Sequence, residues 1–138
     1  YSTLKRGKYD WLLKKFSFIL VLLFFSMYMQ ALTNCTFYKL GKFILYEQKL
    51  NIYVRIDRTA TEQLETDLKT GKFIRFGIRW INECEYELHL IDGNNEQVSF
   101  FRNRKLSMRI TEIYADGYKF EGKVQGSKNT ISNILRKL

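Results

Sequence analysis

The 138-residue chain contains no proline, two cysteines and a single histidine, His89. With no proline and only eight glycines, it lacks the composition that is typical of linkers and disordered tracts. Two cysteines and one distant histidine do not supply the four ligands of a zinc site. The chain also has no glycine-rich loop that could hold a phosphate. We therefore predict no catalytic, cofactor-binding or metal-binding residues and expect a non-enzymatic protein.

One long uncharged segment, residues 16–32, follows a basic lead. The basic residues of this lead are Lys5, Arg6, Lys8, Lys14 and Lys15. This order is typical of an export signal, because basic residues stay in the cytoplasm while the apolar segment enters the membrane. Residues 1–32 are thus predicted to be a leader with one hydrophobic helix that contacts the membrane. Residues 33–138 are predicted to be a single domain exported to the periplasm, the cell envelope or the medium.

The fate of the leader has several alternatives. Cleavage near Ala31 fits a signal peptide, and retention fits an anchor in the inner membrane. Attachment of a lipid to Cys35 fits the outline of a lipobox at residues 32–35, although Asn34 replaces the usual small residue. A buried core helix is a further interpretation.

The basic charge of the chain is divided between the leader and the rest. Residues 33–138 carry 18 Lys and Arg against 13 Asp and Glu, whereas the whole chain has a net charge of +9. So mild an excess does not predict a nucleic-acid partner. The densest basic cluster follows Phe100 and Phe101 and consists of Arg102, Arg104, Lys105 and Arg109. We interpret it as a charged hairpin edge that discourages pairing with other chains.

Downstream of the leader, apolar and polar residues alternate, as half-buried antiparallel strands require. The alternating segments are 51–58, 73–81, 85–91, 106–111 and 118–124. Asp116-Gly117 predicts a two-residue hairpin turn with positive φ, Asp92–Asn95 a slightly longer loop, and Thr70-Gly71 another turn. The sequence therefore predicts an all-β antiparallel meander of about seven to eight strands that forms a small barrel or half-barrel. Residues 59–68 fit a polar strand or a helical turn, and residues 131–138 fit a helix or a strand.

Aromatic residues make up 16% of the chain. We expect Trp80, Tyr86, Phe100, Tyr118 and Phe120 to lie in the core. Some small barrels keep space for one small ligand, so an apolar ligand inside the barrel is the most specific hypothesis.

Three polar residues on one predicted strand face could carry chemistry. His89 could act as a general base, and Glu85 and Glu87 could act as a glycosidase pair. Solvent-exposed strand residues are the favoured interpretation of all three, because no nucleophile is placed beside them by the sequence.

The two cysteines, Cys35 and Cys84, both follow the leader. In an oxidising compartment such a pair favours one disulfide, with two separate buried thiols as the alternative.

Two motifs resemble a known family. Residues 35–43 follow the pattern C-x-x-aromatic-x-x-G-K-F, and residues 80–88 follow W-x-N-[DE]-C-x-Y-x-L. Together with the hairpin at 113–120, they resemble a family of small exported envelope proteins of Gram-negative bacteria. That family is uncharacterised, and its members often carry the label "DNA topoisomerase IV". Its two cysteine positions coincide with Cys35 and Cys84, so the resemblance implies a disulfide between them and disfavours lipidation of Cys35.

The topoisomerase label does not agree with the physical chemistry of this chain. A type II topoisomerase needs a large DNA-binding domain and an ATPase, and this chain has neither the size nor the phosphate-binding loop. We expect instead a binding or structural role in the cell envelope, with a small apolar ligand or an envelope protein as partner. The alternative is a membrane-tethered interaction module that retains its N-terminal helix.

Overall fold

The computed structural model describes residues 34–138, of which Cys35–Leu138 form one compact unit. The leader and its predicted hydrophobic helix lie outside the described residues. Within residues 34–138, no helix is long and apolar enough to cross a membrane. The elements, in chain order, are the 3-10 helix η1 (Cys35–Tyr38), β1 (Gly41–Glu47), β2 (Ile52–Arg58), β3 (Glu62–Asp67), β4 (Phe73–Trp80), β5 (Glu85–Gly93), α2 (Val98–Phe101), β6 (Lys105–Tyr114), β7 (Gly117–Val124) and β8 (Thr130–Lys137).

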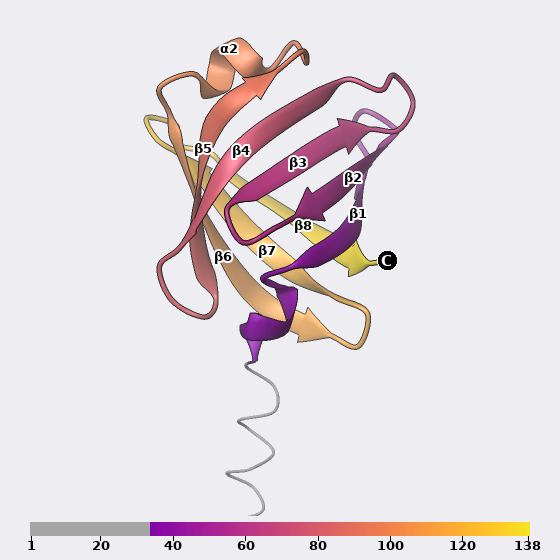
Figure 1. Cartoon of the computed structure of the whole chain (residues 1–138), viewed down its shortest axis with the longest axis vertical. Coiled ribbons are helices and arrows are strands. Elements are labelled where there is room, and N and C mark those ends of the chain that lie inside the picture. The colour runs from indigo at the N-terminus through magenta and orange to yellow at the C-terminus, as the bar shows by residue number, and fades with distance from the viewer. Residues whose placement is uncertain (1–33) are drawn as a thin grey trace, which may run out of the picture. The chain divides into compact units, whose positions relative to one another are not determined.

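The eight strands form a closed antiparallel barrel. Each strand pairs with the next one in the chain, and β8 pairs back with β1. The predicted all-β meander is therefore confirmed, and it closes as a barrel. In such a meander, successive connections alternate between the two ends. The connections β1–β2, β3–β4, β7–β8 and the one containing α2 lie at one end, called here the α2 end (Figure 1). The other end, which holds η1, is called the plugged end.

Residues 59–68 and 131–138, for which the sequence allowed either a strand or a helical form, both contribute a strand. Residues 62–67 form β3, a mostly polar strand between β2 and β4, and residues 130–137 form β8. Both are paired on each side, β8 with β7 and with β1. Pairing with neighbouring strands, which a single segment cannot reveal, decides both cases.

The predicted turn at Asp116-Gly117 is wrong by one residue. Tyr114 pairs with Gly117, so Ala115 and Asp116 form the connection, and neither has a positive φ. Gly117 is needed for a different reason. A Cβ on it would lie 2.0 Å from the backbone oxygen of Leu135, so only glycine permits β7 and β8 to approach here.

The connection between β5 and β6 also differs from the prediction. β5 continues to Gly93, and residues 94–104 contain α2 instead of forming a short hairpin loop. Phe101 on α2 packs against Phe76 in the core, with ring centroids 5.5 Å apart. Phe100 is 44% exposed, so its predicted core position is wrong. Consecutive helical residues point in different directions, and only one of the two phenylalanines can face the barrel.

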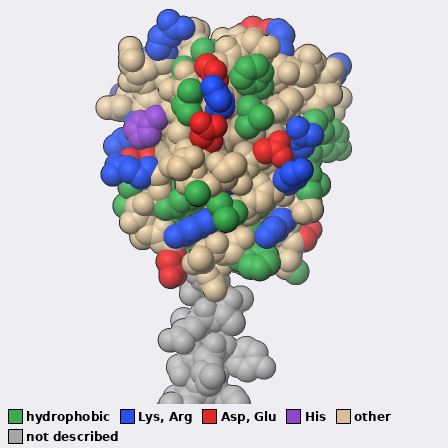
Figure 2. All heavy atoms as spheres, in the orientation of Figure 1, with side chains coloured by type: hydrophobic (Ala, Val, Ile, Leu, Met, Phe, Trp, Pro, Cys, Tyr) green, Lys and Arg blue, Asp and Glu red, His purple; other side chains and the backbone are tan. Residues whose placement is uncertain are grey.

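The interpretation of the basic cluster as a hairpin edge is also wrong, because a closed barrel leaves no edge strand. Lys105 and Arg109 instead pair with Glu87 and Glu121 on neighbouring strands. Arg104 stacks on Phe100, with its guanidinium carbon 4.8 Å from the ring centroid. On the face shown in Figure 2, basic, acidic and apolar side chains are interspersed, and no large patch of one charge is visible.

Candidate functional site

The plugged end is closed by η1, which a disulfide fixes to the barrel. Cys35 in η1 is bonded to Cys84 in the β4–β5 connection, which confirms the predicted pairing. The sulfur of Cys35 is therefore not available for attachment of a lipid. Tyr38, also in η1, is buried and donates a hydrogen bond from its hydroxyl to the backbone oxygen of Tyr114, 3.0 Å away. These two links hold η1 against the barrel at positions far apart in sequence.

A buried cation, Arg58, lies beneath this plug. Its side chain is on the inward face at the end of β2, and the residue is 4% exposed. Nε donates to Gln63 Oε1 at 2.9 Å, and Nη1 donates to the backbone oxygen of Tyr38 at 2.7 Å. Nη2 donates to the hydroxyls of Tyr118 at 2.9 Å and Tyr86 at 3.2 Å. Every nitrogen of the guanidinium thus has a partner, as a buried charge requires.

Aromatic rings surround the same guanidinium. Its carbon lies 4.9 Å from the ring centroid of Tyr86 and 5.0 Å from that of Phe43. The rings of Trp80 and Tyr118 lie within 6 Å. Contact with ring faces partly replaces water as the environment of the charge. Burial raises the pKa of the Tyr118 hydroxyl well above its usual value, so this partner stays neutral. These features identify Arg58 as a structural cation of the plugged end.

The carboxyl group of Glu65 also points into the barrel. Glu65 lies on β3 opposite Ile56 and Ile74, which are both buried and inward-facing. Gln63 Nε2 donates a hydrogen bond to Glu65 Oε1 at 2.7 Å. Burial raises the pKa of this carboxyl, while the Gln63 hydrogen bond and the charge of Arg58 act against the rise. Arg58 makes no direct contact with the carboxylate, because its hydrogen bonds go to Gln63 and to three tyrosines.

From Glu65 toward the α2 end, the inward side chains of β8, β1, β2 and β3 are no longer buried. This group is called here the mouth, and it consists of Ile131, Asn133, Leu45, Val54 and Glu65. Ile131 is 43% exposed, and the other four are half-buried. On the opposite side of the barrel, inward Leu106 and Val124 are buried at the same end. At this end, the interior is therefore less covered on the side of β8, β1, β2 and β3 than on the side of β6 and β7.

The mouth coincides with the shortest strand pairing of the barrel. β1 and β8 share three paired positions, which end at Leu45 opposite Leu135, whereas β1 and β2 share seven. Beyond Leu135, the Asn133 side chain donates from Nδ2 to the backbone oxygen of Tyr46 at 3.2 Å in place of the strand pairing. The barrel is thus closed by a short seam near the plugged end and spreads toward the mouth.

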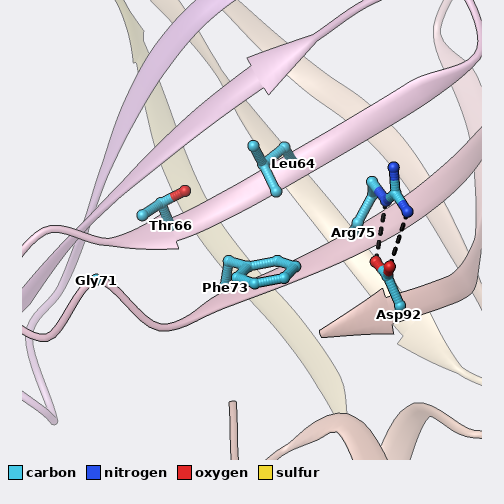
Figure 3. Close-up of a pocket in the computed structure, with 6 residues that line it drawn as sticks. All are labelled: Leu64, Thr66, Gly71, Phe73, Arg75 and Asp92. Carbon is cyan, nitrogen blue, oxygen red and sulfur yellow. Dashed lines mark hydrogen bonds and ion pairs between the residues drawn. The ribbon is translucent and has the colours of Figure 1, made fainter. Parts of the chain in front are cut away.

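A shallow pocket lies on the outer surface, away from the mouth residues. Its volume is about 430 Å³. It is lined by Leu64 and Thr66 of β3, by Gly71 of the β3–β4 connection, by Phe73 and Arg75 of β4, and by Asp92 of β5. Figure 3 shows the Leu64 side chain and the Phe73 ring side by side, with the Arg75–Asp92 ion pair at one edge. Arg75 donates two hydrogen bonds to Asp92, at 2.9 and 2.7 Å, so both charges are already paired. The pocket offers an apolar surface on which the two charged groups are paired with each other.

Two of the polar residues singled out in the sequence, Glu87 and His89, lie close together, and Glu87 is 9% exposed, so its expected solvent exposure is wrong. Glu87 is paired with Arg79 and Lys105, and hydrogen bonds from these two lower the pKa of its carboxyl to about 2. It is therefore ionised at neutral pH and is unsuited to be the general acid of a glycosidase pair. His89 is solvent-exposed, with Nε2 3.8 Å from Glu87. Within residues 34–138, no cluster of three or more His, Cys, Asp or Glu side chains is arranged to hold a metal ion.

Sequence reasoning missed the residues that make the interior unusual. Arg58, Gln63 and Glu65 were not singled out, although alternation along the 51–58 segment places Arg58 on the same face as Val54 and Ile56. The sequence could thus have indicated an inward arginine. It could not have indicated its partners, because Tyr86 and Tyr118 belong to other strands.

Comparison with known proteins gives no further guidance to the function. No family model, curated protein or solved structure matches this chain.

Proposed function

We propose that the domain is a non-enzymatic binding module of the cell envelope and that it holds a small apolar ligand at the mouth. The observation that carries the proposal is the half-burial of Leu45 and Val54 on the inward face of a closed barrel. Inward apolar side chains of a small barrel are normally covered, and a ligand of matching polarity would cover them. The disulfide is compatible with the oxidising compartment that the export signal implies.

Binding of N-phenyl-1-naphthylamine, an uncharged probe that fluoresces in apolar surroundings, tests this proposal. We expect one probe per chain and a Kd in the micromolar range. Val54→Arg places a charge at the mouth and should weaken binding about tenfold or more. The matched control is Tyr53→Arg, because Tyr53 is adjacent on β2 but points outward and is 55% exposed. Both variants retain residues 16–32, so any probe bound there contributes equally.

Two results would overturn the proposal. One is an absence of saturable binding to the unmodified chain. The other is equal binding by the two variants, provided that circular dichroism shows both of them folded. If Val54→Arg does not fold, Leu45→Gln replaces it, because Leu45 is the neighbouring inward residue on β1.

A second candidate function, the membrane-tethered interaction module, is favoured by the outer pocket. Leu64 and Phe73 form its apolar surface, and Tyr53 and Leu68 are exposed nearby on the outer surface. An apolar surface of this kind suits a protein partner in the envelope. N-terminal sequencing of the protein isolated from membranes separates the alternatives. Retained residues 1–32 would support the tether, and a start near Leu32 would exclude it.

A further inference from the structure

We infer that the ligand of the mouth carries a cationic amine group at the end of an apolar body and that Glu65 binds this group. The inference rests on the proposed function, since it specifies the chemistry of the same site. It follows from a comparison of the hydrogen-bond partners of Arg58 and Glu65, which both face the interior.

Arg58 has no need of a carboxylate partner. Its hydrogen bonds go to Gln63, Tyr38, Tyr86 and Tyr118, and four aromatic rings surround it. Glu65 makes no direct ion pair with Arg58, and Gln63 links the two groups by hydrogen bonds. The carboxyl of Glu65 is half-buried on the inward face, so a ligand in the mouth can reach it.

Glu65 has capacity for another hydrogen-bond donor. Within residues 34–138, Gln63 Nε2 is the one group that hydrogen-bonds its carboxyl, at 2.7 Å, whereas an ionised carboxylate accepts several hydrogen bonds. The other inward carboxylate of β3, Asp67, differs in this respect. Its oxygens accept hydrogen bonds from Lys69 and Thr70 in the β3–β4 turn. Of the two inward carboxylates of β3, Glu65 is the one left to bind a ligand.

The position of Glu65 selects the charge of the ligand. Glu65 lies two residues nearer to the α2 end than Gln63, the residue that is paired in register with Arg58. A ligand that enters from the mouth passes Leu45 and Val54 and meets Glu65 before it reaches Arg58. A carboxylate head group would be repelled there, and an ammonium group would form a charge-assisted hydrogen bond. The apolar part of the ligand would lie against the half-buried aliphatic side chains of the mouth.

Three ligands with the same twelve-carbon chain test the inference by calorimetry: dodecylamine, dodecanol and dodecanoate, each below its micelle concentration. In the unmodified chain, dodecylamine should bind about tenfold more tightly than dodecanol, and dodecanoate should bind most weakly. Glu65→Gln should reduce the preference for the amine to less than about threefold while dodecanol binding changes little. The matched control is Glu62→Gln, because Glu62 lies on the same strand but faces outward toward Arg75.

The possible results separate the two proposals. If the three ligands bind equally to the unmodified chain, or if Glu65→Gln keeps the preference for the amine, the role of Glu65 is contradicted and the binding module stands. If none of the three binds saturably, the binding module itself is overturned, and the inference with it.

Discussion

The inward side chains are packed differently at the two ends of the barrel. At the plugged end, Phe43, Tyr118 and Tyr86 are buried, and the charge of Arg58 has a partner at every nitrogen. At the α2 end, Leu45 and three other mouth residues face inward but are only half-buried, and Ile131 is exposed. A barrel of eight strands has an interior that side chains can just fill. Large aromatic residues fill the plugged end, whereas the mouth is lined mainly by smaller aliphatic and polar ones.

This difference concentrates the stabilising interactions of the domain at one end. The plugged end concentrates the interactions that hold the fold: a disulfide, a buried cation and aromatic contacts. At the mouth, Leu45 and Val54 pack against the core but are only half-buried. Residues there can vary with less effect on the fold, because the covalent and hydrogen-bonded framework lies at the other end.

Removal of the disulfide is the strongest test of the plugged end. Replacing both Cys35 and Cys84 by serine should lower the free energy of unfolding by about 4 kcal/mol, because the unfolded chain gains the entropy of an open loop of about 50 residues. Urea unfolding of the oxidised chain and of the double variant measures this loss. A change below about 1 kcal/mol would mean that η1 is held by its other contacts alone.

Arg58→Lys should cost about 3 kcal/mol, because an ammonium cannot supply the planar set of donors that reaches Gln63, Tyr38 and the tyrosines. The control is Arg55→Lys. Arg55 is on the same strand but is exposed and paired with Asp57, so its replacement should change stability by less than about 0.5 kcal/mol. Equal effects in the two variants, measured by urea unfolding, would contradict the structural role of Arg58.

A matched pair of leucines compares the two ends directly. Leu135 and Leu45 are opposite one another in the β1–β8 pairing, yet Leu135 is 2% exposed and Leu45 is half-buried. Leu135→Ala should cost about 3 kcal/mol and Leu45→Ala about 1 kcal/mol, because the first leaves a closed cavity and the second widens an open one. Thermal and urea unfolding measure both. Similar losses would show that the mouth is as closely packed as the rest of the barrel.

The smallest expected effect is the pH dependence that Glu65 contributes. Because its pKa in the folded state is raised above 4.5, the folded state keeps this proton to a higher pH than the unfolded state does. Its contribution therefore lowers stability as pH rises from about 4.5 through the folded-state pKa. Glu65→Gln should remove this fall and gain about 1 kcal/mol near neutral pH. Urea unfolding between pH 4 and 8 compares it with Glu62→Gln, which should follow the unmodified chain.

Much of the fold could be predicted from local pattern. Alternation located five strands, and the number of strands and their short connections predicted a barrel or half-barrel, which the structure closes. The errors arose where a neighbouring strand or residue, and not the local pattern, sets the position of a side chain. Gly117 was assigned a turn with positive φ, whereas the close approach of β8 requires it. Phe100 was placed in the core for its apolarity, but Phe101 occupies the inward position of α2.

The sequence by itself determined the all-β class and which residues of each strand share a face, and it favoured a disulfide between the two cysteines. Only the tertiary structure decided that Arg58 donates hydrogen bonds to Tyr86 and Tyr118, whereas Glu65 accepts one from Gln63. It also decided that the inward residues of the mouth are less buried than those of the plugged end. The physical reason is the range of the interactions. Alternation is a property of one strand, whereas the partners of a buried charge come from strands that meet only when the barrel closes.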